Sequence, residues 1–289
     1  MSVTKQEIAS DKVSDAPELV LDIADLSVSY PNGFLAVEDI SLQVAAGEIV
    51  GVVGESGSGK TTVGLAAAGL LPVGTSVDAS RFRVAGTEVS TLKPKGWRAL
   101  RKTQVGMVFQ EPLAALDPTM TIGKQVLEAA RQVASTRPEA QKEALELLDL
   151  VRLPEPKQRF NMYPHELSGG QRQRVVIAMA LAGKPKLLIA DEPTTALDVT
   201  IQAQILDLLR SMRDTLGLGV LLVSHDISVV SNMAERLVVM LNGRVVQSGT
   251  LQQVLYDEPE PYTLALRAAI PNVDAPPRSL FEIPSYEVN

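Results

Sequence analysis

The sequence predicts an α/β fold built on a mainly parallel sheet that is covered by helices on both faces. Short apolar runs, over residues 48–53, 187–190 and 220–224, have the length and composition of buried strands. Segments with helical periodicity, such as 121–134 and 199–216, alternate with these runs along the chain. The chain has 289 residues and is 45% hydrophobic, so it is large enough to bury a core without disulfides or metal.

The N-terminal third is predicted to consist mostly of strands. Residues 1–17 are polar and are expected to form a flexible tail. Residues 19–30 alternate apolar and polar side chains, which is the period-2 pattern of a strand. The elements expected next are strands over 36–44 and 48–53, a glycine-rich loop, a helix over 61–71, turns and short strands over 72–104, and a strand over 105–109.

Residues 111–183 change character and are predicted to form a helical insert in the α/β domain. Helices are expected over 121–134, 138–151 and 171–182. The α/β pattern then returns with a strand over 187–190, a helix over 199–216, a strand over 220–224, a helix over 227–234 and a hairpin around Asn242-Gly243. The last twenty residues are rich in proline and are expected to be extended.

Composition excludes several classes of function. Cysteine is absent, which rules out disulfides, thiolate catalysis and any zinc or iron–sulfur site with cysteine ligands. The net charge of −7 argues against a dedicated nucleic-acid binder. One basic cluster is interpreted as a solvated face, with an anionic contact as the alternative: Lys93, Lys95, Arg98, Arg101 and Lys102. No apolar run reaches the ~20 residues that span a bilayer, and no secretory signal is visible, so any membrane role is expected to be peripheral.

A phosphate-binding loop is predicted over residues 54–61. Its residues, Gly54-Glu55-Ser56-Gly57-Ser58-Gly59-Lys60-Thr61, match G-x-x-x-x-G-K-[ST] between a buried strand and a helix. The glycines let backbone N–H groups approach phosphate oxygens, and the helix directs its positive end at the same anion. Lys60 is expected to contact the β- and γ-phosphates and Thr61 to ligate Mg²⁺. The sequence therefore predicts that the chain binds and hydrolyses ATP.

Two carboxylates end the apolar strand over 187–190. Asp191 is expected to hold the magnesium, and Glu192 to polarise the attacking water as a general base. Alone, the pair could be a solvated acidic turn. Beside a phosphate loop, the functional interpretation is favoured.

Leu167-Ser168-Gly169-Gly170-Gln171 is a second candidate anion site. Ser168 can cap the helix that follows, and the glycines again allow close backbone approach. As a pentapeptide it could be only a helix cap. A single γ-phosphate does not obviously need two such helix starts from one chain.

With these segments the sequence resembles the nucleotide-binding subunit of ABC transporters. Residues 54–61 and 188–192 match that family's two Walker motifs, and 167–171 matches its signature motif. Gln110 matches the Q-loop glutamine, Ala196-Leu197-Asp198 the D-loop, His225 the switch histidine, and Tyr30 the aromatic residue that stacks on adenine. The resemblance covers roughly residues 19–270.

The resemblance implies a P-loop NTPase core of the ABC type, with an N-terminal antiparallel β subdomain and a helical subdomain. The ATPase domain would span 18–270, with the helical subdomain at about 111–183 and a C-terminal extension over 271–289. Two such domains pair head to tail in this family. The residues expected to bind ATP are Tyr30, Gly54, Glu55, Ser56, Gly57, Ser58, Gly59, Lys60, Thr61 and Thr62 of one subunit with Ser168, Gly169, Gly170 and Gln171 of the other.

The resemblance also assigns the remaining polar positions. Gln110 would be a ligand of magnesium or water and a hinge to the helical insert, and His225 would orient water and Glu192 near the γ-phosphate. Asp198 would organise the dimer interface, and His165 is interpreted as structural. The expected ligands are therefore ATP and Mg²⁺, with Thr61, Gln110 and Asp191 as metal ligands.

Three segments resemble the peptide and nickel importer branch: 111–118, 164–171 and 259–264. Several members of that branch carry a C-terminal cysteine cluster for an iron–sulfur centre, which this chain lacks, so no such centre is expected. The favoured function is the ATPase of a dipeptide or oligopeptide importer. The alternatives are import of nickel or another small solute, an exporter subunit, and a soluble ABC ATPase of DNA repair or translation.

The resemblance implies a place for the chain at the cytoplasmic face of the plasma membrane. Its expected partners are a second ATPase subunit, two transmembrane permeases and an extracytoplasmic solute-binding protein, without nucleic acid. A paralogue is favoured as the second ATPase, but the sequence does not decide whether it is identical. Nor does the sequence name the solute, since selectivity lies in the other subunits.

Overall fold

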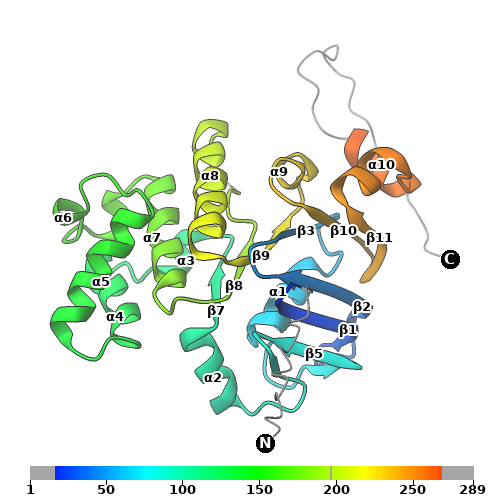
Figure 1. The fold of residues 1–289 in the computed structure, drawn as a ribbon, viewed down its shortest axis with the longest axis horizontal. Helices are drawn as coiled ribbons and strands as arrows, with labels where there is room; N and C mark the ends of the chain where they lie inside the picture. Colours follow the sequence, from blue (N-terminus) through cyan, green and yellow to red (C-terminus); the bar gives the residue numbers. More distant parts are fainter. Residues whose placement is uncertain (1–16, 196, 269–289) are drawn as a thin grey trace, which may run out of the picture.

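A computed structural model describes residues 17–195 and 197–268 (Figure 1). It confirms the predicted α/β class and also contains the expected antiparallel sheet and helical region. The predicted flexible tail, except Pro17, and the predicted extension over 271–289 fall outside the described residues, as does Ala196 of the D-loop. No helix in the described part of the chain has both the length and the apolar composition needed to cross a membrane.

The central sheet carries the strands that were expected to be buried. Within the described residues it has six strands in the order β11-β10-β3-β9-β8-β7, all parallel to their neighbours except the β10–β11 hairpin. The strands are β3 (Ile49–Val53), β7 (Val105–Val108), β8 (Leu187–Asp191), β9 (Gly219–Ser224), β10 (Arg236–Leu241) and β11 (Arg244–Thr250). The carboxyl ends of the parallel strands meet at one edge, where ligands bind in open α/β sheets.

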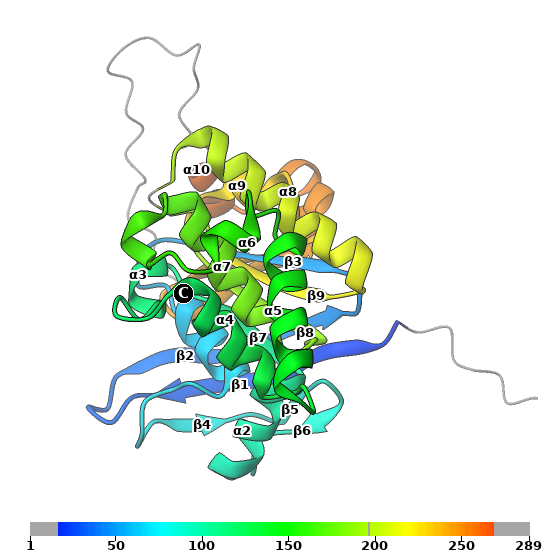
Figure 2. The ribbon, with the colours of Figure 1, turned by 90° about the vertical axis from the view of Figure 1, so that its left-hand side faces the viewer.

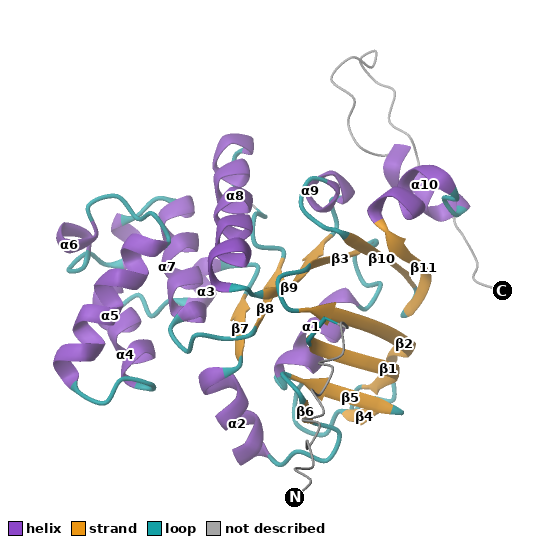
Figure 3. Ribbon diagram, in the orientation of Figure 1, coloured by secondary structure: helices purple, strands orange, loops and turns teal. Residues whose placement is uncertain are grey.

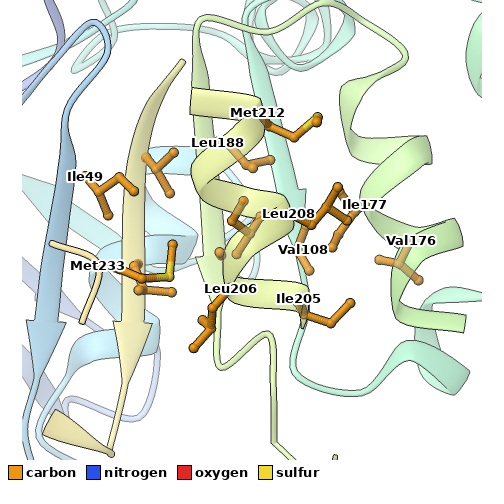
Figure 4. Packing of buried hydrophobic residues seen from close by; sticks show 14 of the residues in the cluster. Ile49, Val108, Val176, Ile177, Leu188, Ile205, Leu206, Leu208, Met212 and Met233 are labelled. Atoms are coloured by element: carbon orange, nitrogen blue, oxygen red, sulfur yellow. The ribbon is translucent and has the colours of Figure 1, made fainter. Parts of the chain in front are cut away.

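Side chains of these strands alternate between two cores. Leu188 and Ala190 pack with α7 (Gly169–Leu181), α8 (Val199–Leu216) and α9 (Ile227–Ser231). Leu187 and Ile189 face the other way, toward α1 (Lys60–Ala68) and the second sheet. Figure 4 shows side chains of α8 lying over the strands on the first face. Both faces of the sheet are therefore covered, as the continuous apolar runs predicted.

The second sheet is antiparallel and packs against α1. Its strands are β1 (Leu19–Ser29), β2 (Leu35–Ala45), β4 (Ser76–Asp78), β5 (Arg81–Val84) and β6 (Thr87–Glu88), in the order β2-β1-β5-β6 with β4 paired to β1. Leu21, Ile23 and Phe82 from this sheet share a core with Val63 and Ala67 of α1. This packing fixes the helix that follows the phosphate loop.

The helical region gathers on one side of the central sheet (Figures 1 and 2). It contains α3 (Pro112–Ala115), α4 (Ile122–Arg131), α5 (Arg137–Leu150), α6 (Pro156–Arg159), the 3₁₀ turn η1 (Pro164–Glu166) and α7. Thr136 and Glu139 form a capping box that starts α5. Val126, Ala130 and Leu148 of the predicted apolar helix faces are fully buried among these helices, whereas Val133 is 36% exposed.

Several elements depart from the sequence prediction. Helix α1 ends at Ala68 rather than at 71 because Gly69 takes a left-handed conformation that stops it. Helix α9 stops at Ser231, three residues before the predicted end. The C-terminal π-helical turn η2 (Gln253–Asp257) and α10 (Pro261–Ala268) were not predicted (Figure 3).

Helix α2 (Pro94–Thr103) was also missed, since residues 72–104 were expected to hold only turns and short strands. It is held by tertiary contacts that local propensity does not reveal, including the edge-to-face pair of Trp97 and Phe82. The basic cluster lies on and just before this helix. Most of it is exposed, as expected of a solvated face, but Arg101 donates to the main-chain oxygens of Ala68 and Gly69.

Candidate functional site

The loop over 54–61 joins β3 to α1 at the carboxyl edge of the central sheet. Two of its glycines leave no room for a side chain. A Cβ on Gly54 would lie 2.1 Å from the main-chain oxygen of Met240, and one on Gly59 would lie 2.7 Å from that of Ala36. Both glycines have positive φ, of 155° and 97°. The chain therefore curls tightly here, which leaves backbone N–H groups to face an anion.

Lys60 is only 5% exposed at the first position of α1. Its Nζ donates to the main-chain oxygens of Gly54 at 2.8 Å and Glu55 at 2.7 Å. Burial lowers the pKa of Lys60, and the carboxylates of Glu192 and Asp191 oppose that shift. The ammonium is thus held inside the loop, where phosphate oxygens would be stronger partners than the neutral carbonyls.

Thr61 and Asp191 bring a hydroxyl and a carboxylate together across the sheet edge. Thr61 Oγ1 donates to Asp191 Oδ1 at 3.2 Å. Burial raises the pKa of Asp191, and the nearby Glu192 adds to the shift while the bond from Thr61 opposes it. Both groups offer the hard oxygen atoms that Mg²⁺ prefers. The residues present therefore fit a magnesium ion beside the phosphate loop.

Glu192 is oriented by three side chains from three parts of the chain. Its Oε2 accepts from Gln110 Nε2 and from Thr195 Oγ1, each at 2.9 Å. Its Oε1 lies 3.0 Å from Nδ1 of His225. Glu192 has a positive φ of 46°, and its N–H donates to the main chain of β9, at Val223. These contacts fix a carboxylate that can accept a proton beside the magnesium-ligand pair.

Tyr30 lies next to the phosphate loop at the end of β1. Its hydroxyl is 3.1 Å from Oγ1 of Thr62, which follows the loop. The contact ties the first strand of the antiparallel sheet to the start of α1. The predicted stacking of Tyr30 on an adenine ring stays a prediction.

The segment over 167–171 starts α7 through a capping box. Ser168 Oγ accepts from the N–H of Gln171, and Gln171 Oε1 accepts from the N–H of Ser168. The predicted capping role of Ser168 is present. Within the described residues, these two side chains bond to each other's main chain and to no residue of the phosphate loop.

Apart from Tyr30, the predicted site residues therefore fall into two groups. We call residues 54–62, 110, 191–192 and 225 the phosphate-loop half, because hydrogen bonds and the chain itself join them. Residues 167–171 are the signature half, which is not hydrogen-bonded to the first within the described part of the chain. Asp198 caps α8 through the N–H of Ile201, and His165 stacks on Tyr163 with ring centroids 5.6 Å apart.

Two residues of this region were missed by the sequence reasoning. Thr195 bonds to Glu192, and a hydroxyl three residues after the carboxylate was the available signal. Tyr262 accepts from the N–H of Glu55 at 3.1 Å, across 207 positions of sequence, and no local pattern could reveal that contact.

The arrangement suits the hydrolysis of a phosphoanhydride. A buried ammonium and a glycine-rich turn face the place where an anion would sit. An oriented carboxylate lies beside them to accept the proton of water.

Comparison with known proteins gives a matching family model, described as ABC transporter, over residues 37–195. This span contains the phosphate loop, Gln110, the signature half and both carboxylates. His225 and Tyr262 lie beyond it.

Curated relatives match over most of this chain. The oligopeptide transport ATP-binding protein OppD of Mycobacterium tuberculosis is 46% identical over 261 residues, covering 89% of this chain. This chain spans only 42% of the length of that relative. The dipeptide transport ATP-binding protein DppD of Haemophilus influenzae is 45% identical, over 87% of this chain and 78% of its own.

Solved structures match over a similar extent. The ATP-binding cassette MJ0796, dimeric in a post-hydrolysis state and bound to ADP and Pi, superposes with a TM-score of 0.70 at 30% identity, covering 80% of this chain and 98% of its own. The protein cbiO1 of Clostridium perfringens, part of the ABC transporter complex cbiONQ, superposes with a TM-score of 0.73 at 28% identity, covering 86% of this chain and 96% of its own.

Proposed function

Because the chain belongs to the ABC transporter family, we propose that it is the ATP-hydrolysing subunit of an importer for dipeptides or oligopeptides. The observation that carries the ATPase assignment is the carboxylate of Glu192, held by Gln110, Thr195 and His225 beside the phosphate loop. Relatives named for dipeptide and oligopeptide transport, at 45% and 46% identity, support the choice of solute.

In this proposal the residues of the phosphate-loop half bind ATP and orient water. Lys60 would exchange its two carbonyl partners for β- and γ-phosphate oxygens. Mg²⁺, which would be held by Thr61 and Asp191 with Gln110 as a further ligand, supplies charge neutralisation on the phosphate oxygens when bound.

Glu192 then accepts a proton from water while the oxygen of that water molecule forms a bond to the γ-phosphorus. The bond from that phosphorus to the bridging oxygen breaks, which leaves ADP and phosphate. His225 fits the role of orienting Glu192, because its Nδ1 donates to the carboxylate when the proton lies on that nitrogen.

The signature half is proposed to act on ATP bound by a second ATPase subunit. Ser168 and Gln171 cap this helix start, and within the described residues the N–H groups of Gly169 and Gly170 bond to no residue of the phosphate-loop half. The dimeric state of the ATP-binding cassette MJ0796 bound to ADP and Pi supports such pairing.

A groove beside Gln110 supports contact with a membrane-embedded permease. Its volume is about 290 Å³, and Leu113 at its edge is 54% exposed. Its lining comes from three segments: Gln110, Glu111, Pro112 and Leu113; Gly169 and Arg172; and Thr195 and Leu197. A permease helix seated there would contact the segment that orients Glu192, which would couple transport to hydrolysis. We therefore place the chain at the cytoplasmic face of the membrane, with two permeases and a solute-binding protein as further partners.

The ATPase assignment is tested by Glu192→Gln. We expect turnover to fall roughly 10²- to 10⁴-fold while ATP affinity stays within about twofold, because the amide keeps the shape but accepts no proton. Glu128→Gln, on the exposed face of α4, is the matched control. Hydrolysis by the Glu192→Gln variant at the parental rate would show that the general-base assignment is wrong.

The solute is tested by uptake in cells whose own copy of the gene is replaced by the Glu192→Gln variant. Loss of labelled dipeptide or oligopeptide uptake, with nickel uptake unchanged, is the expected result. Loss of nickel uptake alone would favour the nickel alternative. Recovery of the chain from membranes without any permease would contradict the transport function.

A further inference from the structure

Two hydrogen bonds join the phosphate loop to the C-terminal part of the chain. The N–H of Gly243, in the turn between β10 and β11, donates to the main-chain oxygen of Ser58 at 3.1 Å. The hydroxyl of Tyr262, on α10, accepts from the N–H of Glu55 at 3.1 Å. Both contacts come from residues after the matched family region, which ends at 195. The loop therefore depends on a segment to which the family match assigns nothing.

Tyr262 is itself fixed in place. It is 4% exposed, and its neighbour Thr263 is fully buried. Gln247 of β11 binds three groups of this segment: its amide donates to the main-chain oxygen of Glu258, and its side-chain oxygen accepts from the N–H of Glu260 and from the hydroxyl of Thr263. The central sheet thus anchors α10, and α10 carries the tyrosine to the loop.

The contact acts on the peptide plane that faces Lys60. The N–H of Glu55 and the C=O of Gly54 belong to one planar peptide group, so a partner that holds one end orients the other. That C=O accepts from Lys60 Nζ at 2.8 Å. Gly54 has a φ of 155° and no side chain, so its own conformation constrains this plane weakly. The hydroxyl of Tyr262 adds a constraint on this peptide from outside the loop.

The chemistry of the hydroxyl suits this position. Burial raises the pKa of Tyr262 above its ordinary value, so the group stays neutral under physiological conditions. A neutral oxygen accepts the Glu55 hydrogen bond without adding negative charge near the place where phosphates would bind.

We propose that Tyr262 is a positioning residue of the ATP site, which orients the Gly54–Glu55 peptide and through it Lys60. It makes the C-terminal helix α10 part of the nucleotide site. This inference rests on the proposed ATPase function. If Tyr262 only filled the core, its hydroxyl would not affect ATP affinity. ATP affinity therefore distinguishes a positioning role from a packing role.

The test is Tyr262→Phe in the full chain, which keeps the buried ring and removes only the hydroxyl. Equilibrium binding of a fluorescent ATP analogue should weaken roughly threefold to tenfold, because the peptide loses the hydrogen bond from the Glu55 N–H. Turnover at saturating ATP, measured in the assembled complex, should change less than about twofold. Tyr256→Phe, at a tyrosine that is 61% exposed, is the matched control and should leave both values unchanged.

Hydrogen exchange gives a second readout that needs no nucleotide. The amide of Glu55 should exchange faster in Tyr262→Phe than in the parent, while amides of β9 keep their protection. Thr263→Val, which removes a bond that anchors α10, should shift ATP affinity in the same direction.

Three outcomes would overturn the inference. Unchanged affinity and unchanged loop exchange in Tyr262→Phe would show that the hydroxyl has no positioning role. Faster exchange throughout the chain would show general destabilisation instead. If the parent chain binds ATP no better than the Lys60→Ala variant, the proposed function is refuted together with the inference. If the parent binds ATP and the Tyr262→Phe variant binds it with the same affinity, only the inference is refuted.

Discussion

The phosphate-loop half and the signature half are built in opposite ways. In the first, Lys60 and Asp191 are buried, and Glu192 takes contacts from the nearby Thr195 and from Gln110 and His225, which are distant in sequence. In the second, the side chains of the exposed Ser168 and the half-buried Gln171 bond to each other's main chain. One half is assembled by folding of the single chain, and the other offers a helix start that bonds to no residue of the phosphate-loop half within residues 17–195 and 197–268. This difference supports the proposal that ATP binding belongs to one chain and hydrolysis to a pair.

A negative charge introduced into the signature half should lower turnover more than any other change described below. Ser168→Asp keeps a good N-cap, so α7 should start as before. Its carboxylate would face the phosphate bound by the partner, and turnover of the assembled complex should fall roughly 10²- to 10³-fold. ATP affinity of the isolated chain should stay within about twofold. Ser168→Asn is the neutral control. Parental turnover in Ser168→Asp would remove the signature half from the site.

A smaller loss of turnover is expected when Glu192 loses its contact with His225, which follows β9. His225→Ala should lower turnover about 10- to 100-fold, because the carboxylate loses a contact that fixes its angle. Affinity for ATP should change little. The matched control is His165→Ala, whose side chain only stacks on Tyr163. Equal losses of turnover in the two histidine variants would contradict the assignment of His225 as the residue that orients Glu192.

Thr195 gives a finer test of the same carboxylate. Thr195→Val removes one of the two donors to Glu192 Oε2 and should cost roughly threefold to tenfold in turnover. Thr200→Val, at an exposed position of α8, is the comparison variant. Turnover of the variants would be measured at saturating ATP. An unchanged rate in Thr195→Val would mean that Gln110 alone suffices to hold Oε2 of Glu192.

The smallest effect concerns stability rather than rate. The raised pKa of Asp191 shows that its ionised form is disfavoured by burial. Asp191→Asn should therefore stabilise the ligand-free protein at neutral pH by about 1 kcal/mol. Thermal unfolding without magnesium or nucleotide measures this change. Ser168→Asn, in the signature half, should not raise the melting temperature. A lower melting temperature for Asp191→Asn would mean that its bond with Thr61 outweighs the burial cost.

Much of this architecture could be predicted because local patterns match it. The apolar strand before Gly54 and the glycine-rich loop fixed the position of the phosphate site, and the apolar strand before Asp191 placed both carboxylates at the same sheet edge. Helix α8 was predicted with its observed bounds, 199–216, because its periodicity is unbroken between Asp198 and Gly217. These predictions depend on residues close together in sequence.

The rest depends on contacts between distant segments. Helix α2 was missed because Pro94 and Gly96 favour turns, whereas packing of Trp97 on Phe82 stabilises a helix. The contact of Tyr262 with Glu55 joins residues 207 positions apart. Sequence reasoning could name Gln110 and His225 only through the family resemblance, and the hydrogen bonds that join them to Glu192 appear only once the chain is folded.

Turnover by the isolated monomer distinguishes hydrolysis by one chain from hydrolysis by a pair. Sedimentation would define the concentration range in which the chain is monomeric, and ATP binding and hydrolysis would be measured in that range. We predict that the monomer binds ATP through its phosphate-loop half and hydrolyses it at no more than about a hundredth of the rate of the assembled complex. Turnover per chain equal to that of the assembled complex, from a proven monomer, would contradict the account.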